Sequence, residues 1–210
     1  MKGSMKLLGT MLCVGICLFV VGKSTAQNLI LNPGFETAGA AASNAANWTV
    51  DTAVGGPVYG IRTNDNPFAG SYNFEAYLAS IGAGPVVQVN QAGIPVVGGT
   101  QYTFSFEADR LSGSAGDNDQ WRILWNAGGD TGYQTYTPGN NTYALTSVAV
   151  TAPAAATSAQ IFFHFAGAAA PSLSATLDID NVSLIPEPST ISMVALGLAA
   201  AVLGLRKRRS

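Results

Sequence analysis

The sequence predicts an all-β fold, an antiparallel β-sandwich, flanked by an N-terminal signal helix and a C-terminal transmembrane helix. Two observations in the body of the chain lead to this fold class. Short runs rich in β-branched and aromatic residues alternate with clusters of Gly, Pro, Asn and Asp, and no segment carries a sustained helical stripe. A third observation concerns the two ends, where apolar stretches lie beside basic residues. We therefore expect one domain, 27–185, between two targeting segments.

The N-terminus has the order of a secretory signal peptide. Two lysines precede an apolar stretch over 7–21, and a short run of small residues follows it. This order predicts a signal peptide over 1–26, export through the Sec pathway and cleavage by signal peptidase after Ala26. An uncleaved N-terminal anchor is the alternative. Cleavage would remove Cys13 and Cys17, the only cysteines, so we expect no disulfide in the mature protein.

The predicted domain is strongly acidic. Between residues 28 and 185 there are eleven acidic residues against three arginines and no lysine, a net charge of minus eight. Such a surface repels nucleic acid, which proteins bind by neutralising phosphates, so we expect no nucleic-acid partner. The charge suits a secreted domain that holds Ca²⁺ on carboxylates.

Period-two alternation marks the clearest strands. The segment 101–109, "QYTFSFEAD", alternates apolar and polar residues, and 120–126 and 157–167 do the same. In 175–185 the apolar positions change phase, which predicts a β-bulge near Asn181. The remaining candidate strands are 29–31, 48–50, 58–62, 72–79, 86–90 and 144–151.

Aromatic residues are the usual platforms for sugars, because a pyranose presents an apolar C–H face to a ring. Trp121 and Trp125 share a face with Ile123, so we interpret both as core residues. The opposite faces of the strands carry polar side chains that would hydrogen-bond sugar hydroxyls. The candidate ligand-binding residues are Glu107, Arg122 and His164, flanked by Tyr133 and Tyr136 in a Gly-rich loop. The alternative is a surface salt bridge between Glu107 and Arg122 beside an exposed His164.

No catalytic motif stands out. His164 is the only histidine, which excludes a His-rich metal centre, and no nucleophile elbow, P-loop or dinucleotide fingerprint occurs. We therefore expect a protein that is not an enzyme. A glycan-acting enzyme that depends on an acid such as Glu107 is the less favoured alternative.

The C-terminal segment 186–210 has three parts: a Pro-Glu-Pro triplet, an apolar run and a basic tail. As a helix, 191–205 would span about 22 Å, short of a hydrocarbon core of about 30 Å. Extending the helix to 189–205 closes part of this gap. The basic tail 206–209 would stay on the cytoplasmic side, which places the domain outside the inner membrane during export.

This order of parts resembles the PEP-CTERM sorting signal of Gram-negative bacteria. The resemblance implies recognition by an exosortase, a membrane transpeptidase-like enzyme, and delivery to the cell surface or extracellular matrix, often in producers of extracellular polysaccharide. A plain tail anchor is the alternative. The matching residues are Pro186, Glu187 and Pro188, then Arg206, Lys207, Arg208 and Arg209.

The body resembles carbohydrate-binding modules of the galactose-binding-like jelly-roll class, on "NLILNPGFET", "GTQYTFSFEAD" and "DIDNVSLI". The resemblance implies a jelly roll that binds carbohydrate, with a structural Ca²⁺ held by Glu36 and Asp180 and by backbone carbonyls. It also implies that Trp48 is a core residue. Solvated edge charges are the alternative at these two acids. The resulting expectation is an exported, non-catalytic, carbohydrate-binding surface or matrix protein. The alternative is a structural or adhesive biofilm matrix protein without glycan affinity.

Overall fold

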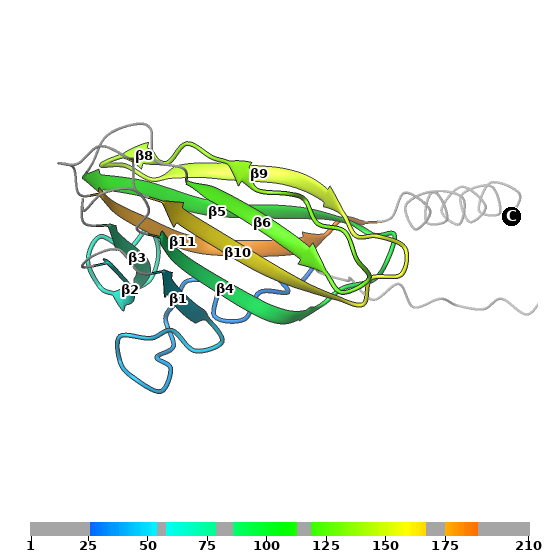
Figure 1. Ribbon diagram of the computed structural model, residues 1–210, viewed down its shortest axis with the longest axis horizontal. Helices are drawn as coiled ribbons and strands as arrows, with labels where there is room; N and C mark the ends of the chain where they lie inside the picture. Colours follow the sequence, from blue (N-terminus) through cyan, green and yellow to red (C-terminus); the bar gives the residue numbers. More distant parts are fainter. Residues whose placement is uncertain (1–25, 54–57, 79–85, 113–118, 167–174, 189–210) are drawn as a thin grey trace, which may run out of the picture.

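The computed structural model describes residues 26–53, 58–78, 86–112, 119–166 and 175–188, and this part of the chain contains strands and no helix (Figure 1). The predicted all-β class is confirmed. The signal segment up to residue 25 and the expected membrane helix 189–205 lie outside the described residues. The strands are β1 (Thr49–Ala53), β2 (Val58–Thr63), β3 (Asn73–Leu78), β4 (Val86–Pro95), β5 (Gln101–Ser112), β6 (Gln120–Trp125), β7 (Gln134–Thr135), β8 (Gly139–Asn140), β9 (Ala144–Thr151), β10 (Ser158–Ala166) and β11 (Ala175–Pro186).

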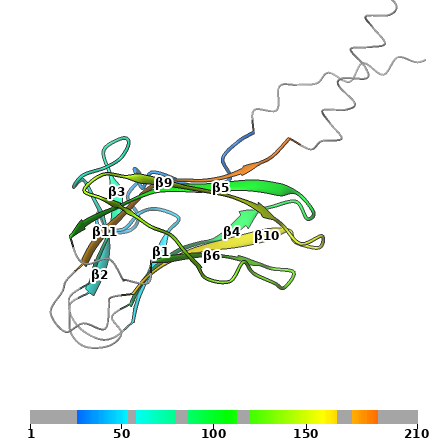
Figure 2. The ribbon, with the colours of Figure 1, turned by 90° about the horizontal axis from the view of Figure 1, so that it is seen from above.

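The strands form two sheets that face each other. The five-stranded sheet has the order β1-β4-β10-β6-β7, and the six-stranded sheet has the order β2-β3-β11-β5-β8, with β9 also paired to β5. All pairings are antiparallel except a short parallel contact between β5 and β8. Figure 2 shows the two layers, with β5, β9 and β11 in one and β4, β6 and β10 in the other. The architecture is the predicted antiparallel sandwich.

Aromatic side chains from alternate strand positions fill the space between the sheets. Along β5, Phe104 and Phe106 are fully buried, as alternation predicts. The ring of Phe163 on β10 lies 4.9 Å from that of Phe106 and 6.2 Å from that of Phe104. These contacts join the two sheets at their centre. All three tryptophans are buried, as predicted: Trp48, Trp121 and Trp125.

The last strand contains the predicted bulge. The pairing of β11 with β5 shifts between Asp180 and Ser183, and Asn181 has a φ of 50°. Asparagine tolerates this left-handed conformation better than most residues, which suits it to the bulge.

The predicted strand over 29–31 does not form, although Leu29 donates its N–H to the carbonyl of Leu184 on β11. The side chain of Asn28 replaces the next ladder contacts. Its amide donates to the Val182 carbonyl, and its oxygen accepts the Leu184 N–H. The Asn28 side chain therefore makes hydrogen bonds to β11 that the backbone of a neighbouring strand would otherwise make.

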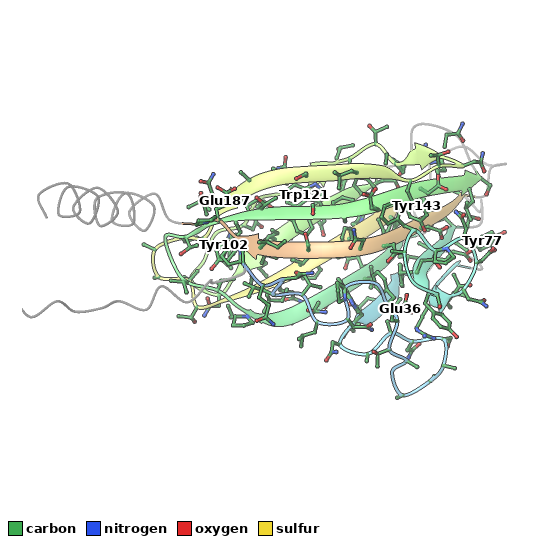
Figure 3. All side chains as sticks on the ribbon, turned by 180° about the vertical axis from the view of Figure 1, so that it is seen from behind. Glu36, Tyr77, Tyr102, Trp121, Tyr143 and Glu187 are labelled. Atoms are coloured by element: carbon green, nitrogen blue, oxygen red, sulfur yellow. The ribbon has the colours of Figure 1, made fainter. Side chains whose placement is uncertain are left out.

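The Pro-Glu-Pro triplet is attached to the sandwich. β11 extends through Pro186, one residue beyond the expected end of the domain, and the Glu187 N–H then donates to the Gln101 carbonyl at 2.9 Å. Pro186 stands opposite Tyr102, and because the next residue, Glu187, bonds to β5, the nitrogen of Pro186 faces away from that strand and no bond to β5 is lost. The Glu187 carboxylate accepts a hydrogen bond from the Thr103 hydroxyl at 3.0 Å. Figure 3 shows Glu187 and Tyr102 at one end of the sandwich, with Tyr143 and Tyr77 toward the other.

Two adjacent positions of β6 test the inward and outward alternation. Ile123 is fully buried, whereas Leu124 is half-buried on the outer face. Ile123→Ala should lower the free energy of unfolding by about 2–5 kcal/mol, because it leaves a cavity between the sheets. Leu124→Ala should cost less than about 1 kcal/mol. Urea denaturation measures both, and equal losses would contradict the assigned faces.

Candidate functional site

The outer face of the five-stranded sheet carries a set of mostly polar side chains from β4, β10 and β6. His164 stands opposite Gln88 on one side and Gln120 on the other. Two residues along, Phe162 stands opposite Asn90 and Arg122. Because their strand neighbours fill the core, these residues must point outward. We call this set the polar face: Gln88, Asn90, Gln120, Arg122, Gln160, Phe162 and His164.

Hydrogen bonds hold part of the polar face in a fixed arrangement. The Asn90 amide donates to the Asp51 carboxylate at 3.2 Å and accepts from the Gln160 amide at 3.0 Å. Asn90 is only 5% exposed, so its orientation is set by these partners rather than by solvent. Gln88 and Asn90 were not predicted as site residues. Their alternation with valines in "VVQVNQ" indicates that they face outward on a strand, and it could have identified them.

Tyr133 provides an aromatic ring at the edge of the polar face. Its ring is 41% exposed and lies 5.2 Å from the His164 ring, and the Arg122 guanidinium carbon lies 5.3 Å from the ring centre. The Gln88 amide donates to the Tyr133 hydroxyl at 3.0 Å, which ties the ring to the sheet. Arg122 also pairs with the Asp130 carboxylate at 2.5 Å. The structure thus brings three of the predicted site residues close together: Arg122, His164 and Tyr133.

The structure separates the other two candidates from this group. Glu107 belongs to β5 of the six-stranded sheet, so the expectation that it shares a face with Arg122 is wrong. It is 8% exposed, and burial raises the pKa of its carboxyl. The alternative salt bridge between Glu107 and Arg122 is also wrong, because Arg122 is paired with Asp130.

Tyr136 is a core residue and does not flank the polar face. It is 6% exposed, and its ring makes an edge contact with Phe106 at 5.0 Å. Burial, with the charge of Asp119, raises the pKa of Tyr136 well above its usual value. The Tyr136 N–H donates to the Asp119 carbonyl beside β6, which turns its side chain inward.

The two predicted calcium ligands, Glu36 and Asp180, lie beside the loop 69–72. The Ala69 N–H donates to Asp180 at 3.0 Å, and the Ser71 and Tyr72 N–H groups donate to Glu36 at 2.8 and 3.1 Å. Burial raises the pKa of Asp180 to about 6, and the charge of Glu36 adds to the rise, while backbone N–H donors offset part of it. The two carboxylates are therefore close enough to repel each other.

This pair fits a cation only with help from other oxygens. Within the described ranges, no group of three or more Asp, Glu, His or Cys side chains could hold a metal ion. Neither Glu36 nor Asp180 forms an ion pair with a basic side chain of the described residues. The two carboxylates are therefore compatible with Ca²⁺ when backbone carbonyls or water complete its six to eight oxygens.

Comparison with protein-family models places the PEP-CTERM protein-sorting motif at residues 184–209. The motif indicates export with a C-terminal, membrane-anchored sorting signal. Among the residues described by the structure, no helix is long and apolar enough to cross a membrane. The motif model begins at Leu184, which is fully buried in β11, so the sorting signal and the sandwich share residues.

Comparison with solved structures supports the fold of the body. The carbohydrate-binding module TmCBM61, solved in complex with β-1,4-galactotriose, is similar at 16% identity and a TM-score of 0.53, over 77% of this chain and 99% of that chain. The CBM22-1 xylan-binding domain of Paenibacillus barcinonensis Xyn10C is similar at 14% identity and a TM-score of 0.50, over 77% and 95%.

The enzymatically active domain of bacteriophage CBA120 tailspike protein 4 is similar at 21% identity and a TM-score of 0.56 over 76% of this chain, which spans only 21% of the tailspike chain. At these identities the similarities show a shared β-sandwich fold. No curated protein matches the sequence.

Two glycines with similar backbone angles test the packing around Glu36. Gly70 (φ 73°) and Gly93 (φ 71°) both adopt the left-handed conformation. A Cβ atom added to Gly70 would lie 2.0 Å from the Glu36 carboxylate, whereas a Cβ atom added to Gly93 would meet no atom within 4 Å. Gly93→Ala should cost about 1–2 kcal/mol of stability from backbone strain alone. Gly70→Ala should cost at least about 1 kcal/mol more, because Glu36 must also move. Thermal unfolding of the two variants measures this difference, and equal losses would rule out the contact.

Proposed function

We propose that the protein is an exported, exosortase-sorted cell-surface or extracellular-matrix protein. Its body is a non-catalytic jelly-roll module that binds carbohydrate on the polar face. The proposed organisation is a signal peptide (1–26), the sandwich (27–185) and the sorting signal (186–210), with a membrane helix over 189–205 and a basic tail over 206–209. Signal peptidase and an exosortase act on it during export.

The observation that carries the binding proposal is the exposed ring of Tyr133 beside the polar face. A sugar stacked on this ring would have the Arg122 guanidinium, His164 and the Gln88 amide within reach of its hydroxyls. Sites for small polar ligands combine an apolar or aromatic surface with a few fixed polar groups. The fixed Asn90 and the tethered Tyr133 reduce the ordering cost of binding.

The acids near this face support a non-catalytic role. Asp51 accepts a hydrogen bond from Asn90, and Asp130 is bonded to Arg122 and to the Gly132 N–H. Both carboxylates already serve structural partners, and Glu107 is on the other sheet. A glycosidase instead needs two carboxyl groups directed at one glycosidic bond.

Affinity electrophoresis tests the binding site. The test glycans are extracellular polysaccharides, β-1,4-galactan and xylan. At least one of them should retard the migration of the protein in the gel. Tyr133→Ala should weaken this binding about tenfold or more, since it removes the stacking surface and a tenfold loss corresponds to about 1.4 kcal/mol. Arg122→Ala should also weaken it.

Two further variants sharpen this test. Tyr133→Phe keeps the ring and loses only the hydrogen bond from Gln88, so it should retain most of the affinity. Glu107→Gln changes the opposite sheet and should have no effect. If none of the glycans retards the wild-type protein, the structural matrix alternative is favoured, and deletion of the protein should then alter biofilm cohesion.

A structural Ca²⁺ at Glu36 and Asp180 forms part of the proposal. The ion would join the loop 69–72 to the first and last segments of the sandwich and neutralise the repulsion between the two acids. At a Ca²⁺ concentration 100 times the Kd, binding should add about 2.7 kcal/mol to the free energy of unfolding. Thermal unfolding with Ca²⁺ and with a chelator measures this gain. Asp180→Asn should reduce it, and a melting temperature independent of Ca²⁺ would contradict the proposal.

A further inference from the structure

A second group of acidic residues lies on the outer face of the six-stranded sheet. Asp178 on β11 stands opposite Glu75 on β3 and Asp109 on β5, so three carboxylates form one row across adjacent strands. Side chains directly opposite each other on one face lie about 5 Å apart at Cβ. Tyr143, which Figure 3 shows toward the end of the sandwich far from Glu187, accepts a hydrogen bond from the Asn73 amide beside this row.

Asp178 and Asn73 are fully buried, each with 0% exposure. Neither oxygen of Asp178, nor the amide oxygen of Asn73, accepts a hydrogen bond of good geometry from a described residue, although the Asn66 amide lies near enough to offset part of the rise that burial causes in the pKa of Asp178. Asp109 differs, because it accepts from the Asn66 amide and from the Thr142 N–H. Tyr143, which contacts the Asn73 amide, is also close enough to Asp178 to sense its charge, so these poorly satisfied acceptor oxygens belong to one buried region. Burying such acceptors is costly unless something positive binds them.

The arginines of the domain are all committed elsewhere. Arg62 donates to the carbonyls of Phe35 and Glu36, and Arg110 pairs with Asp119 at 2.6 Å. Arg122 pairs with Asp130 on the other sheet. Because the sequence has no further Lys or Arg between residues 28 and 185, the domain has no basic side chain left to neutralise this row.

We propose that Asp178 and Asn73, flanked by Glu75 and Asp109, form a second cation site for a hard divalent ion of the Ca²⁺ type. Every group offered is an oxygen, from carboxylates and a side-chain amide, which is the ligand set that Ca²⁺ prefers over softer metals. The amide oxygen of Asn73 matters, since the acidic side chains alone do not make a metal cluster.

This site differs from the one at Glu36 and Asp180. There, backbone N–H groups of the loop 69–72 already donate to the carboxylates. At Asp178, no backbone N–H of the described residues donates to the carboxylate. The cation would join β3, β11 and β5, three strands of one sheet, instead of tying a loop to the sheet.

Calorimetric titration of the chelator-treated protein with Ca²⁺ tests the inference. The wild-type protein should bind two ions, and Asp178→Asn, which keeps the shape and removes the charge, should bind one. Asp180→Asn should also bind one, at the remaining site. Asp65→Asn, an exposed acid near the row, is the control and should still bind two. Near-ultraviolet circular dichroism checks that each variant is folded.

The possible outcomes separate this inference from the proposal for Glu36 and Asp180. If Asp178→Asn leaves the number of bound ions unchanged, or if it stabilises the protein with no change in calcium binding, the inference is wrong and Asp178 is a buried protonated acid. If the wild type binds one ion that is lost only in Asp178→Asn, the inference holds and the Glu36–Asp180 site is wrong. If Asp178→Asn does not fold, Asn73→Leu, of similar size, should also lose one ion.

Discussion

The contact between the two sheets through Phe163 is the constraint on which the rest of the structure depends. The domain has no cysteine, so it cannot be stabilised by a disulfide, and its stability must come from burial between the layers. The Phe163 ring touches Phe104 and Phe106 of the opposite sheet, and the Trp48 ring lies 6.3 Å away. Because these positions are committed to the core, their strand neighbours must face outward. The polar face and the acidic row are the two outer surfaces that result.

Alternation along a strand could be read from the sequence, because successive side chains of a strand point to opposite faces of the sheet. It correctly placed Ile123 and two of the tryptophans in the core, and the change of phase near Asn181 correctly located a bulge. It also placed Arg122 and His164 on outward positions. These results depend only on neighbours along one strand.

Alternation does not say which sheet a strand joins, and the errors come from this limit. Glu107 and Arg122 both face outward, but they do so on opposite sides of the molecule. Tyr136 follows a two-residue strand, which is too short for a period to be recognised, and its burial depends on the distant Phe106. The acidic row was not predicted either, because Glu75, Asp109 and Asp178 meet only through the pairing of β3, β11 and β5.

The overlap between β11 and the sorting motif limits how the two can be exchanged. Leu184 fills the core and Glu187 is bonded to β5, yet both belong to the segment that the motif model matches. Moving residues 184–209 to another protein would separate the end of β11 from β5, the strand with which it pairs. Deleting the same segment would open the sandwich at its base. The complete sorting signal therefore cannot be exchanged as a separate module, because its first residues also complete the sandwich.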